Sequence, residues 1–200
     1  AGKSESLEAF RTLNQKYIKH MRVIFDDMGF LKIENDGKIK GYGTEIGAFV
    51  RVDDLESGYA FEQLDRGIFT NPDKINARVT IPISTYEIIS KGYEVDIMLY
   101  ANNYEDSDKK IKFYDNIEEA INIFEDGSRK AKGTTSEKGL VKSYFANPFG
   151  AIQERDANEK LVREYFHKMF DLGVQVGEIN TSLAVEGKEK DGPRNAAEEL

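Results

Sequence analysis

The stretch Lys110–Gly127, KIKFYDNIEEAINIFEDG, decides the fold class because it places a short strand directly before a capped helix. Apolar and polar residues alternate over 110–114, which is typical of a strand. Asn116, followed three residues later by Glu119, predicts the start of a helix, and Gly127 predicts its end. The sequence therefore predicts helices and strands mixed along one chain.

Comparable signals lie on both sides of this stretch. Apolar residues at three- and four-residue steps predict a long helix from Ser4 or Ser6 to Met28, ended by Gly29. Asn35-Asp36-Gly37 predicts a hairpin turn. Further elements are predicted as strands at 30–34, 38–42, 48–52, 78–84, 93–101 and 174–179, and as helices at 85–90 and 156–173. Together they predict an α+β fold, with an antiparallel or mixed sheet and amphipathic helices packed on one face.

The C-terminal segment 180–200 differs in composition from the rest of the chain. Large apolar residues are absent between Val185 and Leu200, and Gly187, Gly192 and Pro193 interrupt any helical pattern. Such a segment buries too little surface by itself to offset the entropy of ordering it. The sequence therefore predicts one domain over 1–179 and an extended polar arm over 180–200 that a neighbouring subunit holds in place.

Overall composition favours a soluble protein with one full core. The chain has 200 residues, of which 40% are hydrophobic and 11% aromatic, a size at which one domain is expected. It contains no run of eighteen apolar residues and no charged-then-apolar leader. We therefore expect a cytoplasmic protein, or one assembled into a virion, that is neither secreted nor membrane-spanning.

Residue usage also narrows the chemistry. The absence of Cys excludes disulfides, thiolate zinc sites and thiol nucleophiles. A net charge of -8 disfavours bulk nucleic-acid binding, which depends on Lys and Arg releasing counterions from phosphates. Gly41, Gly43 and Gly47 fit no nucleotide-binding pattern, since no Lys-Ser or Lys-Thr pair follows and no helix begins there. We expect no cofactor.

Carboxylates supply the one enzymatic hypothesis. Asp53 and Asp54 end a predicted strand, where oxygen ligands suit Mg²⁺ or Ca²⁺, and Asp96 lies in a later strand. A solvated turn explains the same pair without chemistry. His20 and His167 lie in predicted helices outside any zinc-binding motif, so we expect structural roles for both.

Two charged segments of opposite sign are candidates for protein contact. The segment 128–139 is basic, whereas the turn 105–108 is acidic. An acidic segment of one copy that faces a basic segment of the next would encode a head-to-tail interface. Contact of the basic segment with nucleic acid, or plain solvation, stays open as an alternative. The candidate interface residues are Arg129, Lys130, Lys132, Lys138, Glu105, Asp106, Asp108, Leu183, Val185 and Leu200.

These observations favour a non-enzymatic structural or assembly subunit that forms a homo-oligomer with neighbouring protein subunits, for which a ring is the natural form. By analogy with small, cysteine-free, arm-bearing proteins, a phage head-to-tail connector or tail-end ring protein is the specific expectation. A metal-dependent hydrolase using Asp53 and Asp54 is the alternative, as is a regulatory protein that binds a single host partner. No stretch of the chain resembles a family that we can name.

Overall fold

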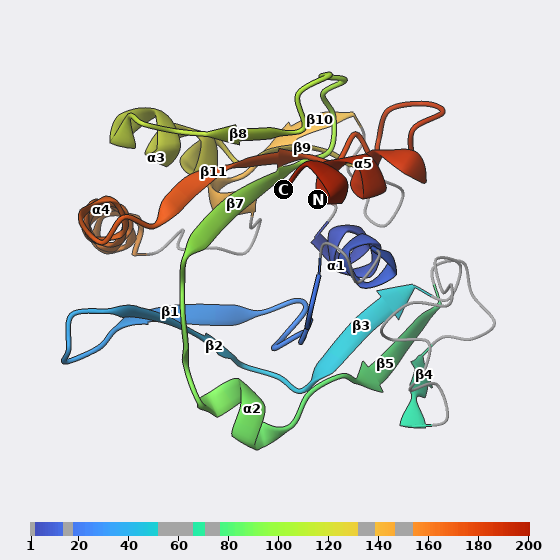
Figure 1. Cartoon of the computed structure of the whole chain (residues 1–200), viewed down its shortest axis with the longest axis horizontal. Coiled ribbons are helices and arrows are strands. Elements are labelled where there is room, and N and C mark those ends of the chain that lie inside the picture. Colours follow the sequence, from blue (N-terminus) through green and yellow to red (C-terminus); the bar gives the residue numbers. More distant parts are fainter. Residues whose placement is uncertain (1–2, 14–17, 52–65, 71–76, 132–138, 147–153) are drawn as a thin grey trace. The chain divides into compact units, whose positions relative to one another are not determined.

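The computed structural model describes residues 3–13, 18–51, 66–70, 77–131, 139–146 and 154–200 (Figure 1). The chain divides into two compact units. Unit 1 comprises residues 1–2 and 95–200, and unit 2 comprises residues 3–94. Both contain helices and strands in antiparallel or mixed sheets, which confirms the predicted α+β class.

Unit 1 is built on a three-stranded mixed sheet of strands β7 (Ile97–Asn102), β11 (Gln175–Asn180) and β8 (Ile111–Phe113). Their order is β7-β11-β8, with β11 parallel to β7 and antiparallel to β8. The strand that the sequence predicts at 174–179 is therefore the central strand. Strands β9 (Ser128–Lys130) and β10 (Leu140–Lys142) form a separate antiparallel sheet. The short 3-10 helix η3 (Tyr144–Ala146) follows β10.

One face of this sheet is packed against α3 (Ile117–Asp126) and α4 (Arg155–Asp171) (Figure 1). The ring of Tyr100, on β7, meets Phe124 of α3 edge-on at 5.5 Å, and Phe124 meets Phe166 of α4 at 5.2 Å. The predicted boundaries of α3 are confirmed. The Asn116 side chain accepts hydrogen bonds from the first turn, and Gly127 takes the left-handed conformation with φ 55°.

The opposite face is packed against a helix that the sequence does not predict, α5 (Asp191–Glu199). Ala196 lies against Ile111 and Ile179, beside half-buried residues of β7. The segment 180–200 is thus not extended, and the fold continues through the domain boundary predicted at residue 179. Two buried alanines, Ala196 and Ala197, let the helix backbone approach the sheet closely, so that no large apolar residue is needed.

Unit 2 contains the predicted hairpin. Strands β1 (Gly29–Ile33) and β2 (Ile39–Gly43) pair antiparallel, and β6 (Tyr93–Glu94) extends the sheet next to β2. The short helix α2 (Tyr86–Ser90) begins at the capping residue Thr85. A Cβ at Gly43 would lie 3.0 Å from Ile89, so a glycine at this position allows α2 to pack against β2.

A second sheet of unit 2 has the order β3-β5-β4, formed by β3 (Gly47–Arg51), β5 (Arg78–Pro82) and β4 (Ile68–Thr70). Proline cannot donate to a strand ladder and favours a sheet edge or a bulge, yet Pro82 belongs to the central strand β5. The proline is tolerated because it is the last residue of the strand, opposite Gly47.

The long helix predicted from Ser4 or Ser6 to Met28 is wrong in its extent. Helix α1 covers only Lys3–Thr12, and residues 18–28 form no helix. Tertiary packing overrides the helical period there. A Cβ at Gly29 would lie 2.2 Å from the Phe25 ring, so Phe25 packs directly on the start of β1 instead of on a helical turn.

Candidate functional site

Helix α5 covers only part of its sheet face in unit 1, and the remainder carries three apolar side chains and the exposed Gln175. Ile97, Leu99 and Phe113 form this open face around the buried Gly177. Leu99 and Phe113 flank Gly177 on the two neighbouring strands. Ile97 and Phe113 are 42% and 39% exposed. Contiguous exposed apolar residues of this kind mark interaction surfaces more often than isolated ones do.

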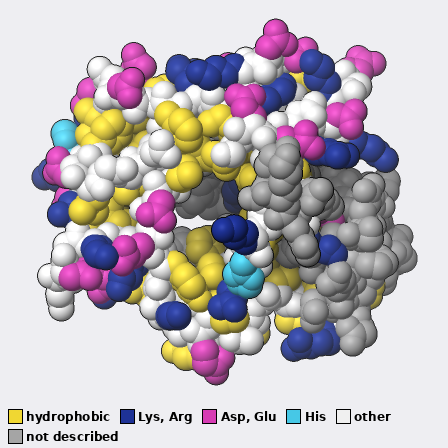
Figure 2. Space-filling model, viewed as in Figure 1, with side chains coloured by type: hydrophobic (Ala, Val, Ile, Leu, Met, Phe, Trp, Pro, Cys, Tyr) yellow, Lys and Arg dark blue, Asp and Glu magenta, His cyan; other side chains and the backbone are white. Residues whose placement is uncertain are grey.

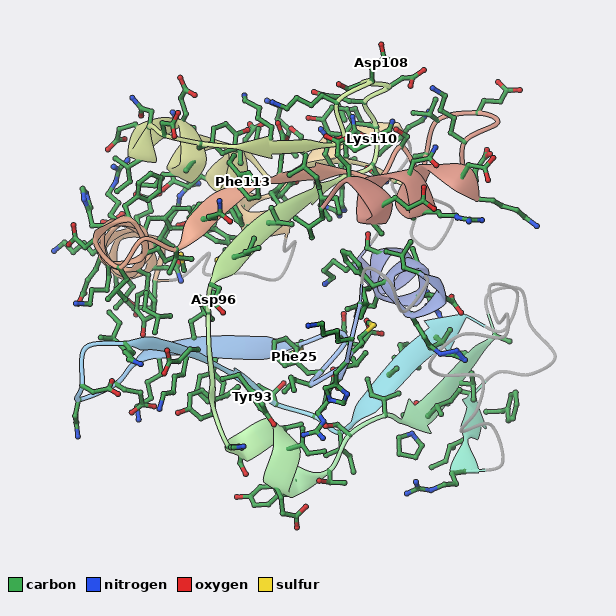
Figure 3. The ribbon with its side chains drawn as sticks, viewed as in Figure 1. Phe25, Tyr93, Asp96, Asp108, Lys110 and Phe113 are labelled. Atoms are coloured by element: carbon green, nitrogen blue, oxygen red, sulfur yellow. The ribbon has the colours of Figure 1, made fainter. Side chains whose placement is uncertain are left out.

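Gly177 shapes the open face. A Cβ at this position would lie 2.2 Å from the carbonyl oxygen of Lys112 and 3.0 Å from the Phe113 ring. Glycine therefore lets the Phe113 ring lie close to the central strand. Figure 2 shows hydrophobic side chains gathered over the strands that Figure 1 labels β7, β11 and β8, and Figure 3 labels Phe113 among them.

The open face ends at the outer edge of β7. Within the described ranges, β11 is the one strand that pairs with β7, and Ala101, near the end of β7, makes a further contact in the chain. An edge strand presents N–H and C=O groups that can pair with a strand of another molecule. The open face and the edge of β7 together form a surface suited to a protein partner.

Two residues of the charged segments predicted to bind neighbouring copies contact the C-terminal segment of their own unit. Lys130 donates from Nζ to the Ala184 carbonyl at 2.9 Å. Asp106 forms an ion pair with Lys188, and this hydrogen bond lowers the pKa of the Asp106 carboxyl. The basic and acidic segments therefore contribute to holding residues 184–188 within unit 1.

The other predicted interface residues lie as follows. Leu183 is buried, Val185 is half-buried and Leu200 is 45% exposed. Glu105 accepts a hydrogen bond from Ser182 through its carbonyl, and Arg129 donates to Ser143 Oγ. Lys132 and Lys138 lie outside the described residues.

Buried polar residues gather where the parallel strands β7 and β11 end. Asn102 and Asn103 follow from β7, and Asn180, Thr181 and Ser182 follow from β11. Thr181 donates to the Asn102 carbonyl from both its N–H, at 2.8 Å, and its Oγ1, at 3.0 Å. This network fixes the chain that leads into α5. Its sequence signal is a polar pair or triplet at the end of two predicted strands.

Beside this network lies a polar cavity of about 460 Å³. Lys110 and Asp108 line it, at the end of the sheet where β8 begins (Figure 3). The buried Lys110 donates from Nζ to the Ser107 carbonyl at 2.7 Å and to Ser182 Oγ at 3.2 Å. Because these bonds link the acidic turn to the segment before α5, Lys110 has a structural role here.

Glu199 ties the end of α5 to the sheet. Its carboxylate accepts hydrogen bonds from the backbone N–H groups of Lys110, at 2.9 Å, and Ile111, at 3.1 Å. We expect Glu199→Ala to speed amide hydrogen exchange at Lys110 and Ile111 and to lower the free energy of unfolding by about 1 kcal/mol.

The neighbouring Glu198 provides the matched control. It pairs with Arg194 on the exposed side of α5, with side-chain exposures of 46% and 66%. Exposed pairs of this kind contribute little, so Glu198→Ala should leave exchange at Lys110 and Ile111 unchanged. Equal effects of the two substitutions would show that Glu199 does not tie α5 to β8.

The residues of the enzymatic hypothesis do not form a site in the described part of the chain. Asp53 and Asp54 lie outside the described residues. Asp96 is exposed, just before β7 and at the opposite end of the unit 1 sheet from Asp108 (Figure 3). Within the described ranges, no three His, Cys, Asp or Glu side chains are placed to share a metal ion. His20 and His167 are both exposed, and only His167 lies in a helix.

Comparison with family models gives no match for this chain, and no curated protein sequence matches it. Across the described residues, no helix combines the length and the apolar character needed to cross a membrane.

Proposed function

We propose that this chain is a non-enzymatic assembly subunit that binds further protein subunits, first of all a second copy of itself. The observation that carries the proposal is the open face of unit 1, with Ile97 and Leu99 on the outer strand β7 and Phe113 on β8. The support thus comes from a folded surface. It does not come from the C-terminal segment, which packs on its own unit.

A second copy suits this surface because the β7 strands of the two copies can pair with each other. Antiparallel pairing of two β7 strands would join the two sheets and bring the two open faces side by side, an arrangement that two-fold symmetry permits. Burial of apolar side chains and pairing of edge N–H and C=O groups would both favour such a dimer. The narrower proposal, a ring within a phage virion, needs the open face to bind a different surface of the next copy.

The test is the mass in solution of Ile97→Glu, because Ile97 lies on β7, the strand that would pair. We expect the unaltered chain to run as a multiple of its 22.7 kDa mass and the variant to run as a single chain, because a buried unpaired carboxylate strongly disfavours the interface. Circular dichroism checks that the variant is folded.

Leu161→Glu is the matched control, since Leu161 is 52% exposed on α4, which packs on the other face of the sheet. Its mass should equal that of the unaltered chain. Dissociation by both substitutions, or by neither, would count against the open face as the interface.

A further inference from the structure

Unit 2 contains a cavity of about 400 Å³ lined by three arginines, Arg11, Arg22 and Arg66. Arg11 belongs to α1, Arg22 to the segment before β1, and Arg66 precedes β4. No Asp or Glu is found among the described residues that line the cavity. Guanidinium groups gathered around one cavity are the groups that bind phosphate and carboxylate in proteins.

The wall of this cavity is held by the fold itself. The N–H groups of Ile83 and Ser84 both donate to the Ile46 carbonyl, at 2.9 and 3.1 Å. Thr85 Oγ1 accepts from the Ile88 N–H at 3.4 Å and caps α2. Backbone hydrogen bonds therefore fix the connection between β5 and α2, so this side of the cavity is formed before any ligand binds.

The lining also has apolar and unpartnered polar groups. Met21, Val23 and Ile88 supply apolar surface. Ser84 lines the cavity as well, and its buried Oγ has no hydrogen-bond partner in the described part of the protein.

We propose that this cavity binds a small phosphate-bearing molecule with an apolar or planar group, of the nucleotide class. The phosphate would contact the arginines, and the remainder of the molecule would contact the apolar lining. A diphosphate can accept hydrogen bonds from several guanidinium groups at once, whereas one carboxylate has two oxygen atoms to offer. Arg11 and Arg66 also make other contacts in the chain, but each guanidinium has five N–H donors.

A single small molecule fits better than a nucleic-acid strand. The volume lies at the lower end of the range for small-molecule sites. A strand needs a basic groove that follows many phosphates, which an acidic chain disfavours. This site lies in unit 2 and does not depend on the open face of unit 1.

Calorimetric titration with adenosine 5′-diphosphate and with inorganic pyrophosphate tests the proposal. We expect one ADP per chain, and an affinity at least tenfold weaker in Arg22→Ala. Arg22→Lys should also bind more weakly than the unaltered chain, because an ammonium group lacks the guanidinium fork. Arg194→Ala, which removes an exposed arginine of α5, should bind ADP as the unaltered chain does.

Three results would overturn the proposal. They are no binding of either probe at millimolar concentration, equal ADP affinity in Arg22→Ala and the unaltered chain, and binding of citrate as tight as that of pyrophosphate. The last would assign the cavity to carboxylate ligands. Thermal melting confirms that each variant is folded, and the mass in solution, which tests the open face separately, should not change in Arg22→Ala.

Discussion

Replacing Phe166 by Ala should lower the free energy of unfolding of unit 1 by about 3–5 kcal/mol. Phe166 is only 2% exposed, and its ring meets Phe124 edge-on at 5.2 Å with an interplanar angle of 73°. The substitution removes this contact and leaves a cavity between α4 and α3. Urea unfolding followed by circular dichroism measures the loss as a lower midpoint.

Leu161→Ala is the matched control, because Leu161 lies on the same helix and is 52% exposed. A surface truncation should change stability by no more than about 0.5 kcal/mol. If Leu161→Ala destabilised the protein as much as Phe166→Ala, the assignment of the buried side of α4 would be wrong.

Replacing Gly192 by Ala should displace α5 from unit 1. A Cβ at Gly192 would lie 2.1 Å from the carbonyl oxygen of Thr181, which no real side chain tolerates. Thr181 is fixed by its two hydrogen bonds to the Asn102 carbonyl, so the helix must move. We expect a cost of about 1–3 kcal/mol, as for other overpacked sites.

Limited trypsin digestion measures this displacement. Trypsin cleaves after Lys190 and Arg194 when α5 is detached from the sheet, and Gly192→Ala should make this detached form more populated. Cleavage should be about tenfold faster for each 1.4 kcal/mol by which the substitution destabilises the packing of α5. Asn195→Ala, an exposed change in the same helix, should leave the rate near that of the unaltered chain. Unchanged cleavage in Gly192→Ala would show that α5 does not pack as closely as the structure has it.

Elements with local signals at both ends could be predicted from the sequence. Asn116 and Gly127 mark the two ends of α3, and the turn at 35–37 marks the hairpin of β1 and β2. These signals act within a few residues, so they depend little on the remainder of the fold.

The elements that depend on distant contacts could not be predicted in this way. Helix α5 is stabilised by the contact of Ala196 with Ile111 and Ile179. Neither this contact nor the close approach of Gly192 to Thr181 has a local signal in the sequence. The prediction of a long helix to Met28 was wrong for the same reason, because the packing of Phe25 on Gly29 is a tertiary contact without a local signal. The open face of unit 1 arises from strand order, which places Leu99 and Phe113 on either side of Gly177.

The mass of the unaltered chain in solution, measured by light scattering over a range of concentrations, tests the assembly proposal most directly. We predict a mass that is a multiple of 22.7 kDa and that falls toward 22.7 kDa on dilution. A mass of 22.7 kDa at every concentration up to the millimolar range would contradict self-assembly through the open face.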